Sequence, residues 1–209
     1  MQRGRVINFS KYRILDFIKS NLYLFIGFLF LILGALLGLI IFDDFKLVSN
    51  LIKQYFENYI GLRQTGTFIK IALLSFVKSL AVFMALFMAG TSLFGVVTVP
   101  LTVFICGTFY GSSVAYLYAE FALKGVAFNA VIFLPSSLVL LLFLIFAAKL
   151  SLIFSVELAR ITLPNSLRGD LFLQFKDYSI KFLLLALGSI SAALIDGLTA
   201  TSMLKFFEL

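Results

Sequence analysis

The chain has 209 residues, of which 62% are hydrophobic and only 13% are charged, and its formal net charge is +7. Soluble domains carry about 25% charged residues, so the composition excludes an ordinary soluble domain and indicates an integral membrane protein. The lack of His excludes imidazole acid–base catalysis and His-liganded metals. Basic residues gather near the N-terminus and over residues 160–181, which suits cytoplasmic loops beside anionic lipid rather than nucleic-acid binding.

The N-terminal part predicts a surface helix followed by a membrane span. Residues 6–19 repeat apolar residues at helical spacing with basic residues between them, a pattern typical of an amphipathic helix on the inner membrane surface. The first span covers about residues 21–42 and ends before Asp43 and Asp44. Because it lacks a small-residue cleavage site and further spans follow, we interpret it as a retained signal anchor.

Residues 45–60 predict a second amphipathic helix. Apolar pairs recur every four residues, whereas Lys53, Glu57 and Asn58 lie on the opposite side. The segment is too polar to cross a membrane. Two placements remain open: the helix lies in the outer interface, or it packs against the rest of the bundle.

The next apolar run, from about residue 68 to Glu120, is too long for one span. One helix of that length would extend about 75 Å, whereas the bilayer core is about 30 Å thick. We therefore predict two spans, about residues 70–94 and 99–119, joined by a hairpin near residues 95–100. Gly95 and Pro100 are the expected hairpin residues, since Pro is tolerated in a first helical turn and Thr98 can cap it.

A fourth span, over about residues 126–158, contains Leu134 and Pro135. Proline forfeits a helical hydrogen bond, so the span is predicted to kink or break at this point. Ser136 and Ser137 follow directly, and their hydroxyls can satisfy the freed carbonyls, as membrane helices permit.

The C-terminal part predicts a basic loop, a short surface helix over about residues 166–178, and a last span over about residues 180–204. The fold class is therefore all-α: one membrane domain, a polytopic bundle of about five transmembrane helices with short interfacial amphipathic helices. A cytoplasmic N-terminus places both basic clusters in the cytoplasm, as the positive-inside rule favours. The segment 43–69 then faces outward.

Lys78 and Asp196 are the ionisable residues that stand out within the predicted spans. They lie about 10 Å and about 12 Å from the outer ends of their spans, so an ion pair between them in the bundle interior is expected. Such a pair either fixes the helix register or lines a path for transport or proton relay. As a third alternative, Lys78 extends toward the interface on its own.

Two GxxxG patterns occur within the predicted spans. One comprises Gly34 and Gly38, and the other comprises Gly107 and Gly111. Glycine lets two helices approach closely, and close packing drives helix association in lipid. The patterns predict either packing within the chain or an interface with another protein, including a second copy of this chain.

Other chemistry is sparse in this sequence. Cys106 is the single Cys and lies in an apolar segment, which favours a packed side chain over a disulfide or redox site. No Gly-rich phosphate loop occurs, and an intramembrane aspartyl protease would need a second intramembrane Asp beside Asp196. We therefore predict no catalytic residue, no metal and no cofactor.

The segment from residue 90 to residue 140 resembles the stage II sporulation protein M family, in which a Gly-containing span, a short turn and a second span lead to a Leu-Pro element. The matching residues are Gly95, Pro100, Gly107, Gly111, Gly125, Leu134 and Pro135. The resemblance implies a non-enzymatic protein of the cell membrane. It also implies partners, because the family's namesake works with two peptidoglycan-cleaving proteins during engulfment of the forespore.

Two functional hypotheses follow. The first is a membrane scaffold that anchors partner proteins such as cell-wall hydrolases through its helical faces and the outer segment 43–69. The second is a small transporter or channel subunit in which Lys78 and Asp196 line the path and Pro135 breaks a helix at the site. Membrane lipid is the expected surrounding in both.

Overall fold

The computed structural model describes residues 21–161 and 171–203, and the described residues are helical almost throughout, which confirms the all-α prediction. The predicted helix over residues 6–19 lies outside the described residues. In chain order the elements are α2 (Leu22–Asp44), α3 (Lys46–Thr65), α4 (Phe68–Gly90), α5 (Gly95–Phe128), the π-helix η1 (Asn129–Phe133), α6 (Leu134–Ile161) and α7 (Leu171–Met203).

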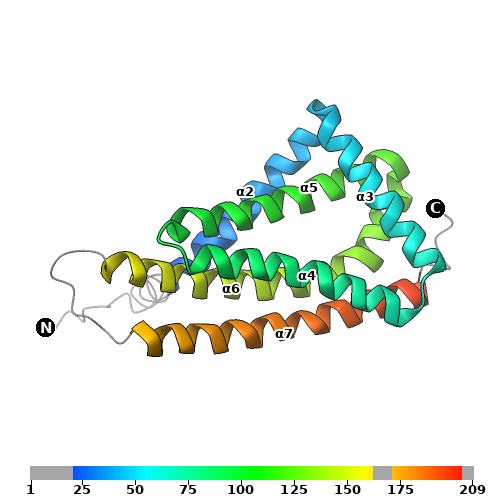
Figure 1. Ribbon diagram of the computed structural model, residues 1–209. Coiled ribbons are helices and arrows are strands. Elements are labelled where there is room, and N and C mark those ends of the chain that lie inside the picture. The colour runs from blue at the N-terminus through cyan, green and yellow to red at the C-terminus, as the bar shows by residue number, and fades with distance from the viewer. Residues whose placement is uncertain (1–20, 162–170, 204–209) are drawn as a thin grey trace, which may run out of the picture.

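Four helical stretches in the described part of the chain are long and apolar enough to cross a membrane. One of them, Gly95–Ile161, has 67 residues, so it would extend about 100 Å if straight, far more than the bilayer core of about 30 Å. The stretch bends at Ala122, which has a φ of 48° and a ψ of −126°. Its two arms, α5 and α6, therefore run in opposite directions (Figure 1), so α2, α4, α5, α6 and α7 each run along the bundle.

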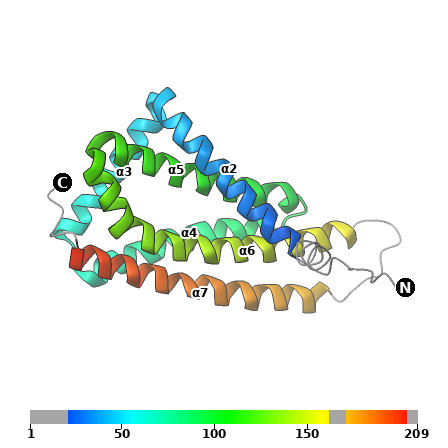
Figure 2. The ribbon, with the colours of Figure 1, turned by 180° about the vertical axis from the view of Figure 1, so that it is seen from behind.

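The helices form an open wedge (Figures 1 and 2). Helices α4, α6 and α7 lie side by side, α2 and α5 form a second pair inclined to them, and α3 bridges the open side of the wedge. We call one end of the bundle the hairpin end; it holds the α4–α5 turn, the start of α2, the end of α6 and the start of α7. The opposite end, which carries α3, is the α3 end. The described residues next to the two basic segments, at the start of α2, the end of α6 and the start of α7, therefore lie at the hairpin end.

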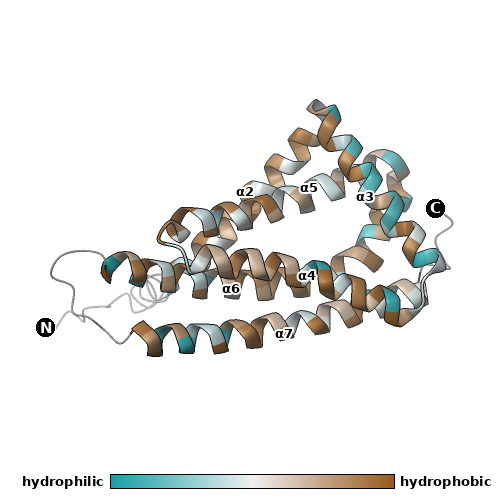
Figure 3. Ribbon diagram, in the orientation of Figure 1, coloured by the Kyte–Doolittle hydropathy of each residue, from teal (hydrophilic) through white to brown (hydrophobic). Residues whose placement is uncertain are grey.

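The hydropathy of the surface matches a membrane protein. Apolar residues cover α2, α4, α5, α6 and most of α7, and polar residues gather on α3, around the α5 bend and near the start of α7 (Figure 3). Many large apolar side chains are exposed, among them Ile40, Met88 and Leu183. In lipid these side chains face a solvent as apolar as themselves, so helix packing rather than burial from water holds the bundle together.

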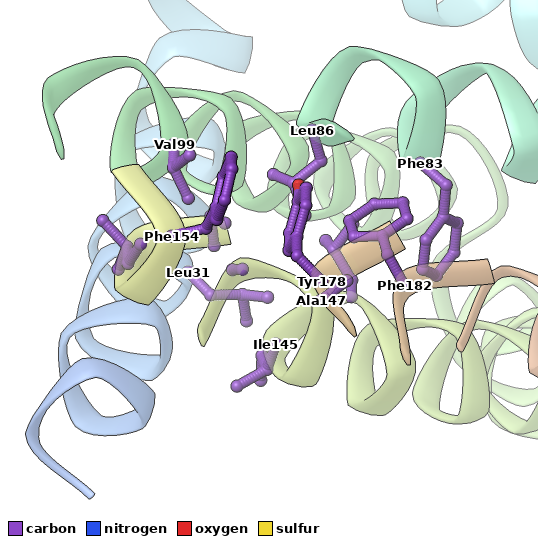
Figure 4. Close-up of a cluster of buried hydrophobic side chains, with 13 residues drawn as sticks. Leu31, Phe83, Leu86, Val99, Ile145, Ala147, Phe154, Tyr178 and Phe182 are labelled. Carbon is purple, nitrogen blue, oxygen red and sulfur yellow. The ribbon is translucent and has the colours of Figure 1, made fainter. Parts of the chain in front are cut away.

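One core cluster fills the half of the wedge toward the hairpin end (Figure 4). Tyr178 of α7 stacks on Phe154 at a ring distance of 4.6 Å and on Phe87 at 5.3 Å. Its hydroxyl lies 3.0 Å from the Ser151 hydroxyl, so the buried phenol is hydrogen-bonded. Tyr178 belongs to the continuous helix α7. The prediction of a separate surface helix over residues 166–178 is therefore wrong from residue 171 onward, and its first residues lie outside the described chain.

The two GxxxG patterns pack against each other inside this chain. A methyl group at Gly34 would overlap the Phe104 carbonyl of α5, and one at Gly107 would overlap the Leu31 carbonyl of α2. Gly38 and Gly111 make equally close backbone approaches to the facing helix. In addition, the Ser112 hydroxyl donates to the Gly38 carbonyl at 3.0 Å. Of the two predicted uses of these glycines, the structure has the internal one.

The hairpin between the second and third spans lies earlier than predicted. Helix α4 ends at Gly90 and α5 begins at Gly95, so Pro100 is inside α5 and Thr98 does not cap a helix. The turn is held by hydroxyl groups: Thr91 donates to the Met88 carbonyl at 3.0 Å, and Ser155 of α6 donates to the Ser92 carbonyl at 3.0 Å. A contact with a distant helix thus helps to set the turn.

The predicted break at Leu134 and Pro135 takes the form of a π-helix. The five residues of η1 precede Leu134, and the chain stays helical through Pro135. A π-helical turn is wider than an α-helical one, so the helix can continue although Pro135 has no backbone N–H to donate. Ser137 donates to the Phe133 carbonyl at 2.7 Å, and Ser136 donates to the same carbonyl at 3.2 Å. The hydroxyls therefore bond carbonyls next to the break, although not that of Val131, which lies four residues before the proline.

Candidate functional site

Helix α3 contributes one wall of the candidate site because of its amphipathic sequence. Ile52, Phe56, Tyr59 and Arg63 recur at spacings of four, three and four residues, and all four side chains are buried. Lys53 and Glu57 on the opposite face are exposed. Of the two placements that the sequence left open, the structure has α3 packed against the bundle.

An aromatic cluster joins α3 to α5 and to the π-helix. Phe56 stacks on Tyr116 of α5 at a ring distance of 5.2 Å and lies 5.8 Å from Phe133. Tyr55 meets Phe109 of α5 edge to face at 4.9 Å. Such pairs contribute about 0.5–1.5 kcal/mol each beyond their buried area, so the cluster fixes α3 against the bundle.

A buried ion pair holds the other end of α3. The Arg63 guanidinium bonds Asp196 of α7, and the two side chains are only 4% and 6% exposed. The second oxygen of Asp196 accepts a hydrogen bond from the Tyr59 hydroxyl at 3.2 Å, and Ser75 of α4 donates to the first. One carboxylate therefore connects α3, α4 and α7.

The Arg63 guanidinium is held in a fixed orientation. Its Nη1 donates to the Tyr59 carbonyl at 3.2 Å, and its Cζ lies 3.1 Å from the centre of the Tyr59 ring. Burial raises the pKa of the Tyr59 phenol well above its usual value, so this hydroxyl stays protonated and remains a donor to Asp196. The Nε of Arg63 is buried without a hydrogen-bond partner among the described residues.

The structure corrects the expected ion pair between Lys78 and Asp196. Asp196 is buried as predicted, but its cationic partner is Arg63. Lys78 is exposed, and its ammonium lies 4.7 Å from the centre of the Tyr55 ring, a cation–π contact that brings it to the level of α3. Within the described part of the chain, Lys78 forms no ion pair.

Arg63, Tyr59 and Ser75 were not predicted as site residues. A signal for Arg63 exists in the sequence, because it follows Tyr59 by four residues and so continues the apolar face of α3 by one further turn. A cation on the apolar face of an amphipathic helix needs a partner inside the bundle. No local signal marks Ser75, which reaches the site only because α4 packs beside α7.

A cavity of about 380 Å³ adjoins the ion pair, and we call it the central cavity. Its α3 end is lined by polar groups, including Tyr55, Lys78 and Asp196, and its deeper part by apolar side chains, including Val82, Ile105 and Leu144. Both candidate polar residues of the sequence thus line one cavity although they do not pair. Ser136 and Ser137, beside the helix break, line it as well.

The described residues of the site supply one buried ion pair, hydrogen bonds and an apolar cavity wall. No cluster of three or more His, Cys, Asp or Glu side chains that could hold a metal ion occurs among the described residues. Cys106, which also lines the central cavity, is a free thiol. Asp196 has its charge balanced by Arg63 and accepts two further hydrogen bonds, so its carboxylate is held in place.

Comparison with protein families matches residues 27–200 to the family described as Stage II sporulation protein M. The matched region includes every described helix except the first turns of α2 and the end of α7. No curated protein and no solved structure matches the chain.

Proposed function

The chain belongs to the stage II sporulation protein M family, and on that premise we propose that this multi-pass membrane protein is a non-enzymatic scaffold that anchors partner proteins. The proposal places the protein in the cytoplasmic membrane with the N-terminus inside, so that α3 faces the cell wall. Peptidoglycan hydrolases are the partner class that the family resemblance implies.

The observation that carries the proposal is the fixed position of α3. The helix is held at one end by the buried pair of Arg63 with Asp196 and along its length by the aromatic cluster around Phe56. Its opposite face presents charged and amide side chains to the exterior, among them Lys53 and Glu57. A rigidly mounted helix with an exposed polar face suits partner binding, because little conformational freedom is lost on association.

The two GxxxG patterns support a role for α3 rather than for α2 or α5 in partner binding. Gly34, Gly38, Gly107 and Gly111 are all buried in the contact between α2 and α5. A partner, or a second copy of the chain in a homo-oligomer, would therefore have to dock on a different face.

Affinity purification in mild detergent tests the proposal. We expect a defined cell-wall hydrolase to co-purify with the wild type and to be lost on the charge exchange Lys53→Glu with Glu57→Lys. The matched control is the exchange Asp177→Lys with Lys181→Glu, because Asp177 and Lys181 also form an exposed pair four residues apart but lie toward the hairpin end. Retention of the hydrolase by the α3 variant, or repeated recovery of the protein alone, would refute the scaffold.

A small transporter or channel subunit is the second candidate, favoured by the presence of Lys78 and Asp196 in one cavity. Against it, the core cluster around Phe83, Leu86 and Val99 packs the space between the central cavity and the hairpin end. Transport predicts solute flux in liposomes that Lys78→Ala abolishes while the fold survives. No flux in the wild type, or flux unchanged in the variant, would remove this candidate.

A further inference from the structure

The central cavity combines an apolar interior with a positively charged mouth. Its deep part is lined by side chains such as Val82, Leu141 and Leu144, whereas Lys78 stands at its α3 end. Two residues of its lining, Ile105 and Phe109, are 58% and 40% exposed, so the cavity opens to the surroundings of the bundle. A cavity of this size lies in the range of about 300–1,000 Å³ that small-molecule sites occupy.

The charge at the mouth has no paired anion among the residues that the structure describes. Arg63 and Asp196 neutralise each other, which leaves the ammonium of Lys78 as a net positive charge. A smaller hollow adjoins this mouth, shares Tyr55, Tyr59, Ser75 and Lys78 with it, and is also lined by Arg63 and Lys70. Lys70 comes eight residues before Lys78, about 12 Å along α4, so two cations lead from the start of the helix to the cavity.

Hydrogen-bond donors accompany these cations. The Tyr55 hydroxyl is in the cavity lining, whereas the lining hydroxyls of Ser79 and Ser136 already donate to the carbonyls of Ser75 and Phe133. The Nε of Arg63, beside the smaller hollow, is a buried donor without a protein acceptor in the described residues. An intramembrane cation without a protein anion calls for an anionic partner, and hydroxyl and guanidinium donors suit the oxygens of a phosphate.

We propose that the central cavity is a binding site for an anionic phospholipid, with one acyl chain between α4 and α5 and the headgroup phosphate against Lys78. The dimensions, the exposed side and the charge all favour this occupant. The apolar lining receives the chain, the opening between Ile105 and Phe109 admits it from the bilayer, and the ammonium that reaches Tyr55 lies where a headgroup enters. The lipid would then contact the same α3 helix that the scaffold proposal assigns to partners, although its binding does not depend on that proposal.

Tryptophan quenching by brominated lipid tests the site directly, because the chain contains no Trp. The reporter is Phe109→Trp, in the cavity lining, and the matched control is Phe146→Trp on α6, which is 46% exposed and is not among the lining residues. Each variant is reconstituted with brominated phosphatidylglycerol or brominated phosphatidylcholine. The measured quantity is the ratio of the two lipids' relative association constants at each tryptophan.

At Phe109→Trp we expect the anionic lipid to bind about fivefold more strongly than the zwitterionic lipid, the ratio for one basic residue near a membrane surface. At Phe146→Trp we expect the two lipids to bind about equally. Adding Lys78→Gln to the reporter should bring its ratio close to one, and adding Lys78→Arg should preserve the preference. Lys149→Gln, which removes a cation elsewhere in the bundle, should leave the ratio unchanged.

Three outcomes would overturn the proposal: equal ratios at the two tryptophans, a preference that survives Lys78→Gln, or quenching at Phe146→Trp with none at Phe109→Trp. The last would mean that protein, rather than lipid, occupies the cavity. Because Lys78 is exposed and makes no ion pair in the described chain, Lys78→Gln should keep the fold, and size-exclusion chromatography in detergent verifies this for each variant. Since partner capture is scored in a separate assay, failure of the lipid site and failure of the scaffold are distinguishable.

Discussion

The buried ion pair between Arg63 and Asp196 allows the most demanding test of the structure. Both side chains are almost fully enclosed, at 4% and 6% exposure. Removing one partner of such a pair leaves the other charge buried without compensation, which costs about 3–5 kcal/mol. Asp196→Asn keeps an acceptor for the Tyr59 hydroxyl but removes the counterion of Arg63. Arg63→Met removes the counterion of Asp196.

The test is a double-mutant cycle. Each single variant, Asp196→Asn and Arg63→Met, should lose about 3–5 kcal/mol of unfolding free energy. At about 2–4 °C per kcal/mol for a chain of this size, the unfolding midpoint in detergent should fall by roughly 6–20 °C. The double variant should lose much less than the sum, because the second substitution removes the orphaned charge, with a coupling energy of up to about 3 kcal/mol.

The exposed pair of Asp177 with Lys181 serves as control for this cycle. Its side chains are 65% and 56% exposed, so Asp177→Asn should cost at most about 1 kcal/mol. If the effects of Arg63→Met and Asp196→Asn were additive, or if Asp196→Asn cost no more than the control, the pair would not be a buried, coupled interaction. The account of how α3 is fixed would then be refuted.

Further predictions concern the contacts around this site and between α2 and α5. Gly34→Ala should destabilise the fold by about 1–3 kcal/mol, because the added methyl meets the backbone carbonyl of Phe104. Gly61→Ala is the control: no atom lies within 4 Å of its methyl, so it should be neutral or stabilise by up to about 1 kcal/mol. Equal effects of the two substitutions in thermal unfolding would contradict the close packing of α2 and α5. Tyr59→Phe removes one hydrogen bond to Asp196 and should cost about 1–3 kcal/mol, measured in the same assay. If Tyr59→Phe left the stability unchanged, water would have replaced the phenol as the donor to Asp196.

Much of the fold could be predicted from the sequence because its signals are local. Apolar runs of sufficient length predict membrane helices wherever they occur, and the four-residue apolar repeat of α3 predicts its buried face. The spacing of Gly34 with Gly38 and of Gly107 with Gly111 predicts close helix contact. Each of these features is a property of one segment in lipid, where the backbone must satisfy its own hydrogen bonds.

What the sequence left open concerns which segments meet. The turn lies at residues 91–94 rather than 95–100 partly because Ser155 of α6 bonds the Ser92 carbonyl, a contact between residues 63 positions apart. Likewise, Lys78 and Asp196 were expected to pair from their similar depth alone, but depth does not fix which side of a helix faces which neighbour.

The sequence by itself therefore determined that the chain lies in a membrane, that its fold is all-α, and roughly where its membrane helices lie. These features follow from the composition and from the spacing of apolar residues. Only the tertiary structure decided that Asp196 pairs with Arg63 and that Lys78, at the mouth of a cavity, forms no ion pair with any described residue. The physical reason is geometric. A buried carboxylate accepts the cation whose donors arrive with the right orientation, and α3 presents Arg63 in that orientation because Ile52, Phe56 and Tyr59 of the same helix are buried against the bundle.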